Sequence, residues 1–163
     1  MNTLKVEINT TPQTVIGWRE WLALPDLGIP AIKAKIDTGA RTSSLHAHFI
    51  EQFKSGGKQR VRFGVRPLRK KRALEFICEA DLLDVRRVKD SGGHAEMRCF
   101  IRTEALLGNH SWSIDISLTS RQDMLFRMLL GRTALKDDFV IDPGRSYLTG
   151  RSLAHSYKKR KEK

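Results

Sequence analysis

The chain has 163 residues, 40% of them hydrophobic, and its 30 Lys and Arg against 18 Asp and Glu give a formal net charge of +12. This length fits one ordinary domain that buries a core without disulfides. Cys78 and Cys99 lack C-x-x-C spacing, which excludes a disulfide scaffold and a Cys-rich zinc module, so we expect both to pack as small apolar residues. With no long apolar run and no leader-like N-terminus, we expect a soluble cytoplasmic protein with no membrane partner.

Short strands separated by Gly, Pro and Asn turns dominate the pattern along the chain. Apolar and polar residues alternate with the period of two that is typical of half-buried strands. We expect strands over 15–24, 29–36, 44–51, 60–66, 82–88, 96–102 and 112–118. One weak helical stretch follows Gly131. Many short strands with one short helix predict an all-β protein that forms a closed barrel.

A tetrapeptide that suits an acid catalyst follows the second of these strands. Asp37, Thr38, Gly39 and Ala40 come directly after the alternating run 32–36. A carboxylate that activates water needs a rigid support, which a strand end provides. The Thr hydroxyl both donates and accepts hydrogen bonds, so it can tie two backbones together, and glycine allows close backbone approach. The same three residue types are common in turns, so a simple turn closing a hairpin is the alternative.

A second segment, 126–135, favours the catalytic interpretation. It is an apolar run that ends in Gly131 and Arg132 before a helix-prone stretch. This arrangement resembles the partner motif of the retropepsins, in the same order and at about the same spacing. The resemblance implies that Gly131 permits tight packing near the Asp37 loop and that Arg132 makes a charged bond that braces it.

The wider chain resembles the bacterial retropepsin-like aspartic endopeptidases, an older label for which names ATP and zinc. The resemblance runs through 16–21, 37–40, 91–96, 124–132 and 139–143. It implies a retropepsin-like acid-protease barrel over 15–150, preceded by an N-terminal segment, 1–14. A basic tail without apolar partners, 151–163, is expected to be solvated and disordered.

An aspartic protease uses two carboxylates that share one proton, yet this chain carries a single Asp-Thr-Gly. Two adjacent carboxyl groups cannot both ionise freely, so one pKa falls and the other rises. We therefore expect a homodimer with Asp37 and its symmetry mate at the twofold axis. Asp142 is the one rival within the chain, but Pro143 follows it and removes the hydroxyl and a backbone donor.

Two further parts of the family pattern are altered here. The retroviral enzymes have an Asp directly after the Asp-Thr-Gly-Ala loop, whereas this chain has Arg41. That change places a positive charge beside the expected cleft, unless Arg41 is only a solvated loop cation. Ser91, Gly92, Gly93 and His94 resemble a flap tip that closes over substrate, although an ordinary surface hairpin explains them nearly as well.

No cofactor is expected from the sequence. His46 and His48 offer two ligands without an obvious third or fourth, and Cys99 or His94 could join them only through an unproven fold. The turn 55–58 is too short for a phosphate-binding P-loop.

The positive charge is concentrated in 58–72, which holds eight Lys and Arg residues. This segment is a solvated face, or it attracts an acidic polypeptide, nucleic acid or the ribosome. The family is linked with the RimK-type ligase that adds glutamates to a ribosomal protein, which suggests a glutamate-rich substrate. The alternative to a peptidase is a catalytically silent basic module that binds RNA or an acidic protein.

Overall fold

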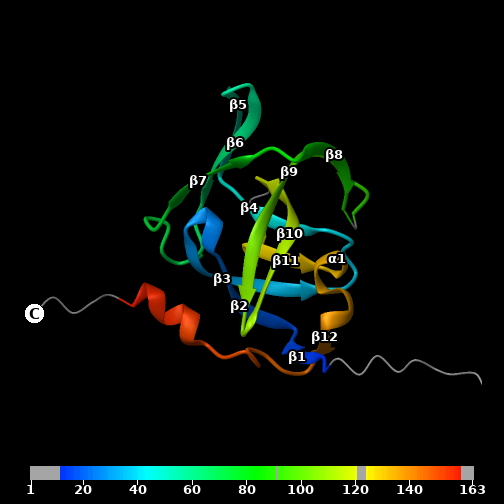
Figure 1. Ribbon diagram of the computed structural model, residues 1–163. Coiled ribbons are helices and arrows are strands. Elements are labelled where there is room, and N and C mark those ends of the chain that lie inside the picture. The colour runs from blue at the N-terminus through cyan, green and yellow to red at the C-terminus, as the bar shows by residue number, and fades with distance from the viewer. Residues whose placement is uncertain (1–11, 91, 121–123, 159–163) are drawn as a thin grey trace, which may run out of the picture.

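The fold is almost entirely β-structure, as a computed structural model shows for residues 12–90, 92–120 and 124–158 (Figure 1). The described residues form twelve strands, one α-helix and three 3-10 helices. The strands are β1 (Thr14–Gly17), β2 (Arg19–Leu24), β3 (Ile29–Asp37), β4 (Ser43–His46), β5 (Phe49–Ser55), β6 (Lys58–Val65), β7 (Phe76–Asp81), β8 (Asp84–Lys89), β9 (Ala95–Leu107), β10 (His110–Thr119), β11 (Met128–Gly131) and β12 (Phe139–Asp142). The helices are α1 (Arg132–Leu135), η1 (Pro25–Leu27), η2 (Lys136–Asp138) and η3 (Ser152–Tyr157).

A closed ring of strands confirms the expected all-β barrel. The main sheet has the order β10-β4-β11-β3-β2-β9-β8, and β10 also pairs with β9. Because β10 pairs with both β4 and β9, six strands close on themselves and β8 extends outward from β9. Strands β5, β6 and β7 form a separate sheet that projects from the ring at the top of Figure 1.

The arrangement of β3, β11 and β4 determines where the Asp37 loop lies. Strand β11 lies between β3 and β4, parallel to β3 and antiparallel to β4. Gly131, at the end of β11, is in register with Asp37, at the end of β3. The loop from Asp37 to β4 therefore passes over the end of β11, where α1 begins (Figure 1).

Alternation along β3 supplies part of the core. Ile32, Ala34 and Ile36 are buried, whereas Lys33 and Lys35 are not. Burial of a complete Ile side chain contributes about 2 kcal/mol. The core also contains both cysteines, as expected from the sequence, and burial raises the pKa of the Cys78 thiol to about 11.

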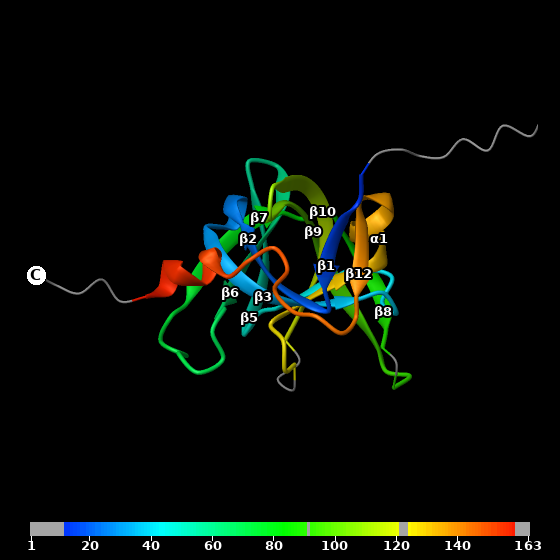
Figure 2. The ribbon, with the colours of Figure 1, turned by 90° about the horizontal axis from the view of Figure 1, so that it is seen from below.

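A buried carboxylate joins the barrel to the C-terminal segment. Glu20 is completely buried in β2 and accepts bonds from the Gly17 amide (2.6 Å), the Leu148 amide (2.9 Å), and the amide and hydroxyl of Thr149 (3.0 and 2.7 Å). Strands β1 and β12 pair in parallel near this junction and lie side by side in Figure 2.

Several strands differ from the sequence prediction: β9 extends to Leu107, β11 and β12 were not among the expected strands, and three further differences concern division or position. The expected strand 15–24 is divided at Trp18 into β1 and β2, and 44–51 is divided at 47–48 into β4 and β5. In the third case, β7 occupies Phe76–Asp81, where no strand was predicted, and the expected strand 82–88 begins only at β8.

Part of the segment expected to be a disordered tail is folded. Residues 152–157 form η3, and the Ala31 amide donates to the Tyr157 hydroxyl (3.2 Å), which donates to the Ala31 carbonyl. Burial raises the pKa of Tyr157 to about 12. The tail prediction was wrong for 152–157, because Leu153, Ala154 and Tyr157 are half-buried there, whereas the adjoining Lys and Arg run has no apolar residue. Residues 159–163, and most of the expected segment 1–14, lie outside the described residues.

Candidate active site

The Asp37 carboxylate is held in one orientation by its own loop. The amides of Gly39 (3.1 Å) and Ala40 (3.2 Å) both donate to its Oδ1, and the Ala40 amide also lies 3.2 Å from the Asp37 carbonyl. No donor reaches Oδ2 within the described part of the chain. One oxygen is thus fixed by the backbone, and the other remains available for a reactant or a second carboxyl group.

The Gly131–Arg132 corner supports this loop from below, in the position that the sequence motif predicted. The Arg132 amide donates to the Ala40 carbonyl (2.9 Å), and its guanidinium donates to the Gly39 carbonyl (3.3 Å). The Arg132 guanidinium therefore braces the loop through a bond to a backbone carbonyl and not to a carboxylate. Thr133 adds two bonds to the Arg41 carbonyl, from its amide (3.2 Å) and its hydroxyl (2.7 Å).

Glycine is required at position 131 by a close backbone contact. A Cβ there would lie 2.6 Å from the carbonyl carbon and oxygen of Thr42. The Gly131 amide also donates to the Ser43 hydroxyl (3.0 Å), which ties β11 to the start of β4. These contacts make the crossing of the two segments tight and rigid.

Asp37 opens into a large cleft, here called the Asp37 cleft. Its volume is about 1360 Å³, and it is lined by the Asp37 loop, β8, the start of α1 and the segment 124–129. Trp18, Leu125 and Phe126 supply apolar walls, and Leu125 is 64% exposed.

Basic residues outnumber acidic ones in this lining by seven to three. The acidic residues are Asp37, Asp90 and Asp115, and Asp115 is paired with Arg102 (2.8 Å). The basic residues are Lys35, Arg41, Arg86, Arg87, Lys89, Arg98 and Arg132. Such a lining favours an anionic ligand.

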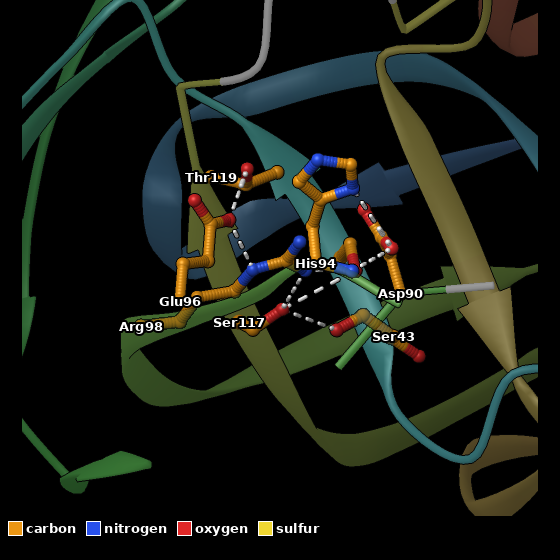
Figure 3. A network of polar contacts seen from close by, with 8 residues as sticks. Ser43, Asp90, His94, Glu96, Arg98, Ser117 and Thr119 are labelled. Atoms are coloured by element: carbon orange, nitrogen blue, oxygen red, sulfur yellow. Dashed lines mark hydrogen bonds and ion pairs between the residues drawn. The ribbon is translucent and has the colours of Figure 1, made fainter. Parts of the chain in front are cut away.

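A buried cation in this lining was not found from the sequence. The Arg98 side chain is only 8% exposed and donates to Glu96 (2.6 Å) and to the hydroxyls of Ser44 (3.3 Å) and Ser117 (3.4 Å). The Thr119 hydroxyl donates to the same Glu96 oxygen (3.1 Å), and Figure 3 shows Arg98 between Glu96 and Ser117. This network fixes β9 against β4 and β10 beside the Asp37 cleft.

The described residues of the predicted flap tip are not part of the cleft lining, although the adjoining Asp90 is. Gly92, Gly93 and His94 do not line the Asp37 cleft, and the His94 side chain is 89% exposed. Gly93 adopts a left-handed φ of 84°, and the His94 amide donates to Asp90 (2.9 Å), which closes the turn. The fourth predicted tip residue, Ser91, lies outside the described residues. This hairpin instead contributes residues 86–90, from β8 and Asp90, to the lining of the Asp37 cleft.

Two residues of the predicted catalytic loop face outward. Thr38 and Arg41 are both exposed, and Arg41 lines the Asp37 cleft. Arg41 thus lies beside the cleft, as the sequence predicted. The Thr38 side chain lies at the surface of this single chain.

The intrachain rival, Asp142, lies elsewhere. It ends β12 and does not line the Asp37 cleft. Its carboxylate accepts from the Gly144 amide (2.9 Å), so it closes a turn, which was the preferred interpretation from the sequence.

The histidines considered as ligands have other partners. His46 lies 3.2 Å from the Arg127 guanidinium, and His48 lies 2.7 Å from Glu75. Burial and then Arg127 lower the pKa of His46, with smaller effects from His48 and Arg66. Within the described ranges, no three His, Cys, Asp or Glu side chains gather as a metal site would require.

The helices of the described residues are all too short or too polar to span a membrane.

The basic segment 58–72 is not one uniform ridge. Arg60 in β6 pairs with Asp81 (2.6 Å), and Arg66 approaches Glu75 (3.9 Å). Arg69, Lys70, Lys71 and Arg72 lie in the exposed loop after β6. The free cations are thus concentrated in that loop.

The sequence matches the family model for the retropepsin-like aspartic endopeptidase RimB over residues 15–152. It is 43% identical over 136 residues to a "probable alpha-L-glutamate ligase" of Shewanella halifaxensis, covering 83% of this chain and 30% of the relative. A protein with the same name from Desulfotalea psychrophila is 44% identical over 149 residues, which is 89% of this chain and 32% of the relative. The chain thus spans about a third of these relatives.

A solved structure of a Legionella pneumophila protein of unknown function is also similar. It superimposes with a TM-score of 0.71 and 29% identity, covering 85% of this chain and 99% of the other. With the Asp-Thr-Gly-Ala loop braced by Gly131 and Arg132 in a closed barrel, these matches show that the chain belongs to the RimB-like family of retropepsin-like aspartic endopeptidases.

Proposed function

We propose that the protein is an aspartic endopeptidase whose dyad consists of Asp37 from each of two identical chains. The observation that supports this most is the fixed Asp37 carboxylate, held by two amides and braced by Arg132 at the edge of a large cleft. Thr38 and Gly39 are exposed beside it, which leaves room for a second chain to cover the motif.

In the proposed reaction, one Asp37 is ionised and its mate is protonated. The ionised carboxylate removes a proton from water, whose oxygen attacks the peptide carbonyl carbon, while the protonated carboxyl group gives its proton to the carbonyl oxygen. The tetrahedral diol then collapses. Its C–N bond breaks, the leaving nitrogen takes the proton of the protonated carboxyl group, and a hydroxyl group of the diol gives its proton to the other carboxylate as the product carboxyl group forms. One shared proton therefore remains on the dyad.

The charge of the Asp37 cleft suggests the substrate class. Seven basic residues line it, of which Arg86 and Arg98 are paired with Asp84 and Glu96, and Arg41 follows the catalytic loop directly. We therefore propose an acidic, glutamate-rich polypeptide as substrate. The names of the longer relatives, which refer to alpha-L-glutamate ligases, are compatible with glutamate chemistry.

Replacing Asp37 by Asn tests the proposal directly. Asn keeps an oxygen for the Gly39 and Ala40 amides but cannot act as base or acid, so we expect a loss of at least about 10³-fold in peptide hydrolysis. Asp142→Asn is the matched control, because Asp142 also follows a strand but does not line the cleft. Retained hydrolysis in Asp37→Asn would show that the mechanism is wrong.

A catalytically silent binding module is the second candidate, supported by the excess of cations in the cleft. It predicts that wild-type protein retains RNA or an acidic protein but hydrolyses no acidic peptide. Affinity and hydrolysis measured on the same labelled oligoglutamate peptide and on a neutral peptide would separate the two functions.

A further inference from the structure

A second cavity lies beside the Asp37 cleft, with a volume of about 520 Å³. No acidic residue of the described chain lines it. Six cations surround it, whereas the Asp37 cleft combines both charges. The cations of the second cavity are Arg19, Lys33, Arg69, Lys70, Lys71 and Arg127.

The two cavities adjoin each other. Leu125 and Phe126 line both of them. On β3, Lys33 faces the second cavity, Lys35 faces the Asp37 cleft, and Asp37 ends the strand, so these alternate residues share one face. At about 3.3 Å per residue, Lys33 lies about 13 Å from Asp37, the length of about four residues of an extended peptide.

The cations of the second cavity have no carboxylate partners among the described residues. Other cations of the chain, such as Arg60 and Arg102, form ion pairs shorter than 3 Å. The Nε of Arg127 is buried and lacks a hydrogen-bond acceptor in the described structure. Burial, followed by Arg69, Arg72 and Arg66, lowers the pKa of Arg127. An anionic ligand in the cavity would offset this repulsion between the cations.

The floor of the second cavity is apolar. Leu68 and Phe126 line it together with Trp21. Lys33 lies over the Trp21 ring (5.5 Å), and Phe126 meets Trp18 edge to face (5.8 Å). Because these ring contacts are already made, the floor suits an aliphatic side chain better than a stacked nucleobase.

We propose that the second cavity is an exosite for an acidic segment of the polypeptide that occupies the Asp37 cleft. The rim cations bind carboxylates of this segment, and an apolar side chain covers Leu68. This inference rests on the proposed function for the identity of the ligand. A second copy of the chain is a poor occupant, because its own net charge is +12.

A pair of labelled peptides tests the exosite by fluorescence anisotropy with Asp37→Asn protein, which prevents cleavage. The short peptide has about eight alanines, and the long one adds Glu-Glu-Leu-Glu-Glu at each end, because about four residues separate the two sites. The test variant reverses three rim charges, Arg69→Glu, Lys70→Glu and Lys71→Glu. The matched control reverses three exposed cations on the β5–β6 hairpin, Lys54→Glu, Lys58→Glu and Arg62→Glu.

The rim variant should weaken binding of the long peptide about tenfold, and the control variant by less than about threefold, because individual exposed ion pairs are weak. The single change Lys33→Glu, compared with Lys54→Glu, provides the same test if the triple variant fails to fold. Equal weakening in rim and control variants would overturn the exosite, because net charge alone would explain it.

Two further measurements separate the other occupants and the proposed function. If the rim variant weakens binding of a single-stranded uridine RNA but not of the peptide, the cavity binds RNA and the exosite is overturned. If the rim variant changes only the sedimentation coefficient, the cavity contacts a second copy of the chain and the exosite is likewise overturned. If wild-type protein cleaves nothing while the rim variant still loses peptide affinity, the exosite stands and the peptidase proposal falls. If long and short peptides are cleaved equally by the rim variant and the wild type, the exosite falls and the peptidase remains.

Discussion

At the scale of single residues, some residues of the site are revealed by a sequence motif, and others are brought together only by the fold. The position of Asp37 at a strand end and the bracing role of Arg132 were predictable, because each depends on its own motif. Arg98 was not. Its neighbour Glu96 lies two residues away on β9, but Ser44 and Ser117 come from two other strands, so local spacing does not reveal the network.

Glu20 is predicted to be essential for stability. A Gln there offers one acceptor oxygen and turns an NH₂ group toward the donors of residues 17, 148 and 149, so buried groups lose their partners. We expect Glu20→Gln to lower the free energy of unfolding by about 1–3 kcal/mol in urea denaturation. The exposed Glu51→Gln serves as control, and similar values for both variants would contradict the role of Glu20.

His46 is predicted to make stability depend on pH. Burial, followed by the Arg127 charge, lowers the pKa of His46 in the folded chain below its ordinary value of 6.5, so the unfolded chain binds the proton more readily. The contribution of His46 is therefore complete above pH 6.5 and is lost as the pH falls toward the folded pKa. Urea unfolding at several pH values should show a smaller decline for His46→Gln than for wild type, with the exposed His155→Gln as control. An unchanged decline would contradict this prediction.

At the scale of elements, the sequence predicted strand positions better than strand partners. The alternation from Ser44 to Phe49 passes through 47–48 without a break, yet the backbone changes sheets there. The Ala47 amide donates to Thr119 of β10 and the His48 amide to Gly64 of β6. The pattern of apolar and polar side chains indicates which residues are buried, but it does not indicate which strand accepts the hydrogen bond of each backbone amide. The separate β4 and β5 therefore could not be predicted locally.

The crossing of β11 beneath the Asp37 loop gives a prediction at this scale. Gly131→Ala would place a Cβ 2.6 Å from the Thr42 backbone, so the loop must shift. We expect a loss of about 1–3 kcal/mol in unfolding free energy together with reduced peptide hydrolysis. Gly144→Ala is the control, because its Cβ meets nothing closer than 3.5 Å. Equal stability of the two variants would show that the crossing is not tight.

At the scale of the whole molecule, closure of the barrel depends on β10 pairing with both β4 and β9, two strands far apart in the chain. Composition and the number of short strands indicated a barrel, and the family resemblance indicated that it is a retropepsin-like barrel. The packing of η3 on β3 was missed because contacts such as the Tyr157–Ala31 bonds join segments far apart in the chain.

The dyad shared between two chains is the central claim, and mixing subunits tests it most directly. Wild-type protein is re-equilibrated with an equal amount of Asp37→Asn protein, and hydrolysis of an acidic peptide is compared with that of the wild type alone. If each active site needs Asp37 from both chains, mixed dimers are inactive and activity falls to about half. Unchanged activity after mixing would show that one chain suffices and would contradict the account.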